Sequence, residues 1–196
     1  MPHTTKKPNK RSQNLNKRME DETRKQQNVF TRGRKKIHIL FDGAGIKRGV
    51  IRMINKKETE YVVGCIAWLS NKDILKALAN KKGCCIVCTK DRLTRGMRNQ
   101  RAYAAIKPAY PGGTIRIVGE KKGKWHSSLM HHKFLIGLDA SGKPLWVTNG
   151  SFNITESAVS KNLENLMIME DPDVAECYFK EFKRVHQISN PLKMKV

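Results

Sequence analysis

Apolar and polar residues follow each other along the chain in a pattern that predicts strands and helices in turn from residue 37 onward. The apolar runs IHILF (37–41), YVVGCIAWL (61–69) and CCIVCT (84–89) have the length and composition of buried strands. Between these runs, apolar residues recur every three or four positions, as on the buried face of a helix. The two predicted faces consist of Ile46, Val50, Ile51 and Ile54, and of Ile74, Leu75 and Leu78. This alternation predicts parallel strands joined by crossover helices.

The second half of the chain predicts more strands and a closing helix. The arginine-rich segment 91–105 is expected to form a third helix. Further strands are expected at 114–119, 132–139, 145–148 and 165–169. The middle two flank the turn ASGKP and should form a hairpin. A last helix should begin after Asp171 and Pro172, a typical cap and first-turn pair. We therefore expect an α/β domain with a mixed, largely parallel sheet flanked by helices.

The first 36 residues differ in composition from the rest of the chain. They contain twelve Lys and Arg against three acidic residues, a net charge of +9, and almost no apolar side chains. Such a segment cannot build a core, so we expect a disordered basic arm over residues 1–36 and a folded domain over 37–196. The arm is either a solvated tail or a sequence-independent grip on phosphates.

The net charge of the whole chain is +22, far more than solubility requires. It implies a polyanionic partner, with nucleic acid as the first candidate and an acidic membrane surface as the second. We find no apolar run long enough to span a bilayer and no signal-peptide pattern, so we expect a soluble, cytoplasmic protein without stable membrane insertion.

Five cysteines form an odd set, and without a secretory signal the default is reduced thiols. Cys84, Cys85 and Cys88 could suggest a zinc site. However, they lie in an apolar run that lacks a second CxxC or a close pair of histidines. We favour a buried strand, in which free cysteine packs as a small hydrophobic residue.

Three short polar motifs follow one another in the second half of the chain. They are His131-x-Lys133 with Asp139 at the end of the same predicted strand, then Gly150-Ser151-x-Asn153, then Glu164-Asn165. Side chains two residues apart on a strand point to the same face. His131 and Lys133 should therefore share a face, as should Ser151 and Asn153, whereas His132 should face the other way and pack elsewhere.

These residue types suit the displacement of a phosphodiester. A neutral His131 can attack phosphorus and form a covalent phosphohistidine, which divides one hard step into two easier ones. A carboxylate such as Glu164, bonded to the other ring nitrogen, would fix the tautomer. The side chains of Lys133, Ser151 and Asn153 would bind the non-bridging oxygens, where charge builds up. No metal or cofactor is then required.

The ordered set resembles the HKD motif of the phospholipase D superfamily, which has His-x-Lys, four residues, Asp, then Gly-Ser-x-Asn and an acid before the next strand. The resemblance covers residues 37 to 185, approximately. Five residues separate Lys133 from Asp139 where the family has four. Either a bulge at Gly137 displaces Asp139, or this acid does not match. In the family it is thought to be structural more than chemical.

The resemblance also implies a partner. Larger members carry two motifs in one chain, whereas this chain carries one, as do the short bacterial Nuc-like nucleases. It therefore implies a phospholipase D-like half-domain that pairs as a two-fold homodimer. One His131 would be the nucleophile, and the partner subunit's His131 would protonate the leaving oxygen.

The substrate is less constrained than the reaction, because relatives cut nucleic acids or act on phospholipids. Residues 37–196 still carry a net charge of +13, which favours a nuclease. The alternatives are a lipid phosphodiesterase, which should show an exposed apolar surface, and a catalytically idle basic nucleic-acid-binding protein. The predicted nucleic-acid contacts are Arg92, Arg95, Arg98, Arg101, Lys121, Lys122, Lys124 and Trp125. For the arginines, a solvated charged face is an equal alternative.

Overall fold

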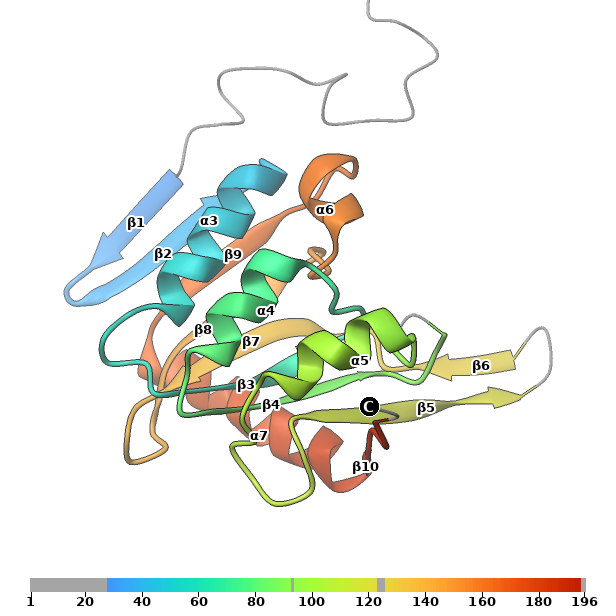
Figure 1. Ribbon diagram of the computed structural model, residues 1–196. Coiled ribbons are helices and arrows are strands. Elements are labelled where there is room, and N and C mark those ends of the chain that lie inside the picture. The colour runs from blue at the N-terminus through green and yellow to red at the C-terminus, as the bar shows by residue number, and fades with distance from the viewer. Residues whose placement is uncertain (1–27, 93, 123–125, 195–196) are drawn as a thin grey trace, which may run out of the picture.

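A single mixed sheet organises the computed structural model, which describes residues 28–92, 94–122 and 126–194 (Figure 1). Its strands are β1 (Asn28–Arg32), β2 (Lys35–Leu40), β3 (Tyr61–Ile66), β4 (Gly83–Thr89), β5 (Ile115–Lys122), β6 (His126–Leu129), β7 (Lys133–Leu138), β8 (Pro144–Gly150), β9 (Leu166–Glu170) and β10 (Asn190–Pro191). They lie in the order β1-β2-β9-β8-β7-β3-β4-β5-β10, and β6 pairs with β5 off this path. The helices are α3 (Gly43–Ile54), α4 (Lys72–Ala79), α5 (Met97–Ala104), α6 (Glu156–Ser160) and α7 (Pro172–Gln187).

The mixed α/β class predicted from the sequence is confirmed, but parallel pairing is less extensive than expected. Only β3 with β4 and β4 with β5 pair in parallel among the described strands. The other pairings, including those of β7 with β3 and with β8, are antiparallel. The hairpin of β7 and β8 is one cause, because a short turn reverses the chain direction and parallel neighbours need a crossover connection.

Helices cover both faces of the sheet and enclose two cores. Helices α3, α4, α5 and α6 lie on one face, and α7 crosses the other (Figure 1). The larger core lies under the first group and contains Ile46, Ile74 and Leu135. The smaller lies under α7 and contains Phe134 and Phe182. Burying a side chain of this size contributes about 1.5–3 kcal/mol, so both layers hold the sheet in place.

The predicted helix faces are confirmed where apolar periodicity was strongest. In α3, Ile46, Val50 and Ile54 are buried, and the Asp42 side chain caps the helix by accepting a hydrogen bond from the Gly45 amide at 2.6 Å. Asn71 caps α4 in the same way, accepting from the Ile74 amide at 3.2 Å. These caps satisfy amides that have no partner within the helix.

Two predicted boundaries are wrong. The third helix does not span 91–105, because the Asp91 carboxylate accepts the Thr94 amide at 2.9 Å and holds a turn, so that α5 begins only after Gly96. The basic arm does not reach residue 36, because β1 pairs with β2 in an antiparallel hairpin. An edge strand needs only one partner and tolerates many charged residues. Residues 1–27 lie outside the described residues.

The cysteine-rich segment is the central strand β4, as the core interpretation predicted. Cys84 and Cys88 face the larger core and Cys85 the smaller one. Burial raises the pKa of the Cys84 and Cys85 thiols to about 12, so both are protonated at neutral pH.

No helix within the described ranges has the length and apolar character needed to cross a membrane.

Candidate active site

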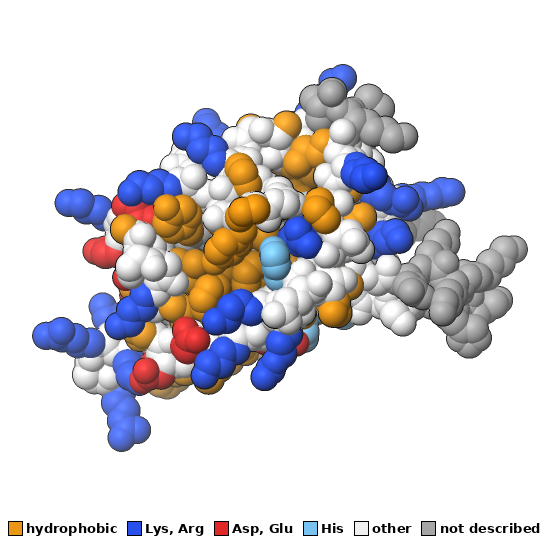
Figure 2. Space-filling view, turned by 90° about the horizontal axis from the view of Figure 1, so that it is seen from below, with side chains coloured by type: hydrophobic (Ala, Val, Ile, Leu, Met, Phe, Trp, Pro, Cys, Tyr) orange, Lys and Arg blue, Asp and Glu red, His pale blue; other side chains and the backbone are white. Residues whose placement is uncertain are grey.

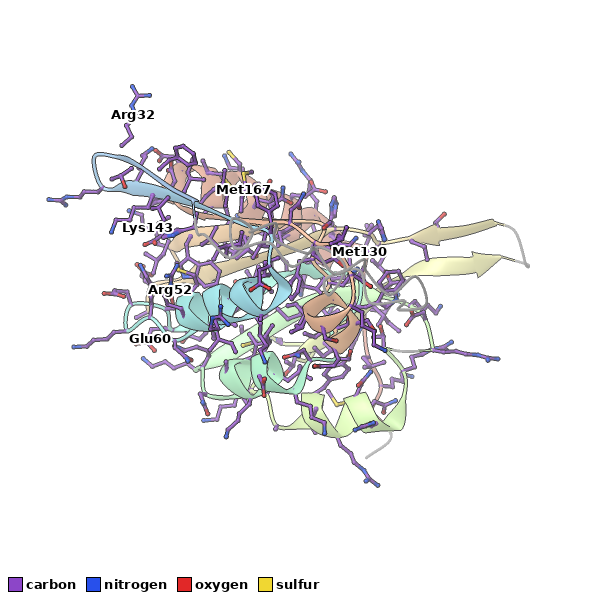
Figure 3. The ribbon with its side chains drawn as sticks, turned by 90° about the horizontal axis from the view of Figure 1, so that it is seen from above. Arg32, Arg52, Glu60, Met130, Lys143 and Met167 are labelled. Carbon is purple, nitrogen blue, oxygen red and sulfur yellow. The ribbon has the colours of Figure 1, made fainter. Side chains whose placement is uncertain are left out.

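The three polar motifs meet at one end of the sheet, where β7 and β9 begin and β3 and β8 end. The antiparallel register places Lys133 opposite Ile66 and Leu166 opposite Gly150. Met130, which precedes this end of β7, lies toward the projecting β5–β6 ribbon, whereas Lys143, in the β7–β8 turn, lies at the opposite end (Figure 3).

The His131 side chain is exposed at this end of the sheet. Its ring meets the Trp68 ring edge to face, with the centroids 5.7 Å apart. Trp68 is itself fixed twice: its backbone amide donates to Asn153 Oδ1 at 3.3 Å, and its indole N–H donates to the Asp91 carboxylate. An accessible imidazole held against a fixed ring is suited to attack on a substrate that approaches from solvent.

Lys133 lies beneath His131 and is only 8% exposed. Its Nζ donates a hydrogen bond to the backbone carbonyl of His131 at 2.7 Å. Burial lowers the pKa of the Lys133 ammonium, and the negative charge of Glu164 opposes that shift. A partly desolvated ammonium interacts more strongly with a phosphate than one in water does.

Ser151 and Glu164 form the other half of the cluster. Ser151 Oγ donates to Glu164 Oε2 at 2.5 Å, and the Asn162 amide donates to Glu164 Oε1 at 3.2 Å. Asn165 fixes the backbone of Ser151, because its side-chain oxygen accepts a hydrogen bond from the Ser151 amide at 2.9 Å. Gly150 permits this approach, since a Cβ there would lie 2.3 Å from the Asn165 carbonyl oxygen.

Contacts join five of the six predicted residues into two groups. His131 contacts Lys133 and, through Trp68, Asn153, whereas Ser151 is bonded to Glu164. The charge of Glu164 acts on Lys133 across the gap between the two groups. Among the described residues, the Glu164 carboxylate accepts hydrogen bonds from Ser151 and Asn162 and not from the His131 ring. Glu164 thus acts on the hydroxyl and, through its charge, on Lys133. Trp68 and Asp91 are members of the site that the motifs did not predict.

Asp139 lies away from this cluster, at the opposite end of β7. Its Oδ1 accepts hydrogen bonds from the Ser141 amide at 2.8 Å, the Ser141 hydroxyl at 2.6 Å and the Lys143 amide at 2.9 Å. The expected irregularity is present, as the β7–β8 register shifts between Gly137 and Leu138. Its assignment to the catalytic residues is therefore wrong: Asp139 stabilises the hairpin turn.

His132 points to the α7 side of the sheet, as the alternation along the strand predicted. Its Nε2 lies 3.5 Å from Glu181 Oε1, and its ring lies 5.6 Å from that of Phe134. The two neighbouring histidines therefore have different environments.

Comparison with known proteins decides the family. A family model described as "Cardiolipin synthase, PLD-like domain" matches residues 50–186. The chain belongs to the phospholipase D superfamily. This superfamily assignment covers both the catalytic cluster and the central strands.

Relatives and a solved structure agree with that assignment. An uncharacterized protein of Acanthamoeba polyphaga mimivirus is 26% identical over 186 residues, covering 76% of this chain and 65% of that protein. A mitochondrial cardiolipin hydrolase of Danio rerio is 29% identical over 134 residues, covering 67% and 53%. The chain thus spans about two thirds of the first relative and half of the second. The superfamily member Nuc from Salmonella typhimurium shares the fold, with a TM-score of 0.57 at 19% identity over 81% of this chain and 98% of Nuc.

The four arginines predicted to contact nucleic acid do not lie on one helix. Arg92 and Arg95 lie in the turn before α5, whereas Arg98 and Arg101 lie on the helix. Arg95 Nε donates to the Asp91 carbonyl at 3.2 Å and so holds that turn. Arg92 and Arg98 instead line a common cavity. The prediction had placed all four arginines on one helix over residues 91–105.

Two of the three predicted lysine contacts, Lys121 and Lys122, lie on the β5–β6 ribbon, which projects beyond the sheet (Figure 1). The backbones of Lys121 and Lys122 pair with Ser127 and His126. Lys124 and Trp125 lie outside the described residues, so their predicted contacts stay predictions.

An apolar groove lies beside His131, on the α7 side. Its volume is about 500 Å³, and its apolar lining consists of Val118, Leu129, Met130, Val185 and Ile188. Leu129 is 52% exposed and Ile188 70% exposed. Figure 2, which views this side of the sheet, shows apolar side chains gathered at its centre with Lys and Arg around them. The sequence did not predict this exposed apolar surface.

In the parts of the chain that the structure describes, no three His, Cys, Asp or Glu side chains are grouped as a metal ion would need.

Proposed function

We propose that the protein is a metal-independent phosphodiesterase that hydrolyses nucleic acid through a phosphohistidine on His131. The observation that carries this proposal is an exposed His131 side chain whose own backbone carbonyl accepts the buried Lys133 ammonium. The imidazole is accessible for attack, and the ammonium lies where it can bind the oxygens of the same phosphate.

The reaction takes place in two displacements. In the first, a ring nitrogen of His131 bonds to phosphorus as the bond to the leaving oxygen breaks, and His131 of the partner subunit protonates that oxygen. In the second, water loses a proton to the same partner histidine and attacks phosphorus. The phosphorus–nitrogen bond breaks, and both histidines return to their starting states.

Two further side chains stabilise the charge that develops on the phosphate oxygens. The oxygen of the Asn153 side chain accepts the Trp68 amide, so its NH2 group is an oriented donor that needs no rearrangement during the reaction, which makes its electrostatic contribution large. The Ser151 hydroxyl donates to Glu164, and it would donate to the phosphate once that bond is released.

The dimer supplies the second histidine. The sequence contains a single His-x-Lys followed by Ser-x-Asn, so one chain holds one nucleophile and no equivalent acid. The exposure of His131 leaves room for a second copy to approach around a two-fold axis.

Nucleic acid is the favoured substrate because of charge. The folded part of the chain carries a large excess of Lys and Arg over acids, which suits a polymer of phosphates. A packaging protein with an idle site would need the same charge, but not the buried ammonium beside an accessible imidazole.

The decisive test measures, with EDTA in excess, whether the protein cleaves single- and double-stranded DNA and RNA. We expect the wild type to cut at least one of them and His131→Ala to bind but not cut. His132→Asn is the matched control and should retain cleavage, because His132 is turned toward α7. Loss of wild-type cleavage on adding EDTA would disprove the metal-free mechanism.

A lipid phosphodiesterase is the second candidate, and the apolar groove beside His131 favours it. The similarity to proteins named mitochondrial cardiolipin hydrolases supports the same alternative. Incubation with vesicles that contain cardiolipin, in parallel with the nucleic acids, separates the two. Release of phosphatidic acid without any cleavage of nucleic acid would reverse our order of preference.

A further inference from the structure

A second, polar cavity lies next to the catalytic cluster, on the side of the sheet that carries α4, α5 and α6. Its volume is about 660 Å³, within the range of ordinary ligand sites. Its lining includes Ser70, Asn71, Lys72, Arg92, Arg98 and Glu156. None of these residues belongs to the catalytic cluster.

The cavity and the active site share three connections of the chain. Each connection first contributes a residue that borders His131 or holds Trp68, and then, one to three residues later, a residue of the cavity. The pairs are Trp68 and Ser70, Asp91 and Arg92, and Asn153 and Glu156. Three residues of chain span at most about 10 Å. The backbone of the cavity therefore lies within about 10 Å of residues that border His131 or hold Trp68, a distance that an adjacent phosphate of the same strand can span.

The charges in the cavity favour an anion. Among the described residues, the guanidinium groups of Arg92 and Arg98 make no ion pair or hydrogen bond. The acids are partly engaged, because Asp73 pairs with Lys47 at 2.7 Å and Glu156 accepts the Asn71 amide at 2.8 Å. Two such guanidinium groups lining one cavity are suited to a phosphate, because each can donate two parallel hydrogen bonds to a pair of phosphate oxygens.

The start of α4 adds to this preference. The Asn71 side chain caps the Ile74 amide, and Lys72 and Asp73 are the first residues of the helix. The positive end of the helix dipole therefore faces the cavity that these residues line. Lys72 adds a third cation at the same place.

We propose that this cavity binds a second phosphate of the nucleic-acid strand, which flanks the scissile phosphate on one side. The inference rests on the nuclease function proposed above. Arg92 and Arg98 contact the flanking phosphate, while the scissile one lies at His131. Arg95 has a different task, because its side chain already holds the turn through the Asp91 carbonyl.

The test compares substrates with one and two phosphodiesters. Bis(4-nitrophenyl) phosphate and a dinucleotide have one such group, and trinucleotides extended on either side have two. In the wild type, extension on one side should lower KM about tenfold, as expected for hydrogen bonds to a charged group. Arg92→Gln/Arg98→Gln should lose that gain while its turnover of bis(4-nitrophenyl) phosphate stays at the wild-type level.

The matched control is Lys76→Gln/Lys180→Gln. It removes the same amount of charge from exposed positions on α4 and α7 that do not line the cavity. This variant should keep the gain from extension. The salt dependence of oligonucleotide binding should also become shallower by about one unit of slope in the arginine variant and remain nearly unchanged in the control.

A substitution of opposite sign sharpens the test. Glu156→Gln removes a negative charge from the cavity but keeps an oxygen that can accept the Asn71 amide. It should lower KM for the extended trinucleotide and leave KM for the dinucleotide unchanged.

The outcomes separate the two proposals. Suppose that the wild type cuts nucleic acid. The cavity proposal is then wrong, and the nuclease proposal stands, if Arg92→Gln/Arg98→Gln still shows the full fall in KM on extension. The same holds if this variant loses activity on bis(4-nitrophenyl) phosphate as much as on the trinucleotide. If the wild type cuts nothing, the nuclease proposal fails. The cavity proposal is then tested by itself, by measuring the affinity of the dinucleotide and the trinucleotide for His131→Ala with and without the two arginine substitutions. If these substitutions weaken the binding of both ligands equally, or of neither, the cavity proposal is wrong.

Discussion

Polar side chains at the two ends of the central sheet differ in how far they are engaged in hydrogen bonds. At the end with His131, the imidazole is exposed, and the buried Lys133 ammonium has, within the described ranges, only a backbone carbonyl as hydrogen-bond partner. At the other end, Glu170 accepts both His38 at 2.8 Å and Lys56 at 2.5 Å, and Asp139 accepts three bonds in its turn. One end keeps its polar groups available for a substrate, and the other uses them to stabilise the fold.

Lys133→Met should separate these two roles most strongly. Turnover should fall about 10²- to 10³-fold, because an ammonium that stabilises the transition state is lost. The free energy of unfolding should stay unchanged or rise by up to about 1 kcal/mol, because the buried charge is replaced by an apolar side chain of similar length. Turnover and urea denaturation measure the two effects. A large loss of stability without loss of turnover would reverse the assignment of this residue.

Glu170→Gln should have the opposite profile. Burial raises the pKa of the Glu170 carboxyl, but hydrogen bonds from Lys56 and His38 outweigh it and hold the pKa below its ordinary value. The substitution should cost about 1–2 kcal/mol of unfolding free energy near neutral pH. Because a lowered carboxyl pKa stabilises the fold only above the unfolded value, this difference should disappear as pH falls below about 4.5 and through the folded pKa.

The control for Glu170→Gln is turnover measured below the unfolding temperature, which should stay within a few-fold of the wild type. A stability difference that persists at low pH would show that the ion pairs are not its cause.

Asp139→Ala should affect stability to a smaller extent and leave the chemistry intact. The substitution leaves the amides of Ser141 and Lys143 without their carboxylate partner in an exposed turn. We expect a loss of about 1 kcal/mol in unfolding free energy and little change in kcat. Thermal denaturation and turnover are the measurements. A fall in kcat comparable to that of Lys133→Met would place Asp139 back among the catalytic residues.

Glu164→Gln should give the smallest of the four effects, a shift in the alkaline limit of activity. Burial lowers the pKa of Lys133, and the charge of Glu164 opposes this. Removing that charge should lower the pKa further, so activity should fall at a lower pH than in the wild type. A pH profile of kcat/KM measures the shift. Ser151→Ala, which keeps the carboxylate, should leave the alkaline limit in place even though its activity is lower.

The end of the sheet that stabilises the fold was harder to predict than the catalytic end. His131, Lys133, Ser151 and Asn153 could be proposed because their spacing repeats the HKD pattern, and they lie at or just beyond the ends of β7 and β8. The hairpin role of Asp139 depends on a register shift at Gly137, where a Cβ would collide with the Trp146 ring at 2.2 Å. Local sequence does not record that contact.

Other differences have equally specific causes. Helices α3, α4 and α7 were predicted because caps and apolar periodicity agree with one another. Strand β1 was missed because its residues are mostly polar and charged, and because, of the described strands, it pairs with β2 alone. Trp68 and Asp91 were missed because their contacts join segments more than twenty residues apart.

The position of Trp68 gives the protein a built-in optical reporter. Its indole lies between the His131 ring and the Asp91 carboxylate, at the junction of the catalytic cluster and the arginine cavity. Trp146, by contrast, is fully buried and bonded to Thr59 at 2.9 Å, so its emission provides a constant reference. In a Trp125→Phe variant, which removes the third indole of the sequence, occupation of the active site by a phosphate or a base would therefore change the fluorescence of Trp68 and not that of Trp146, without any label.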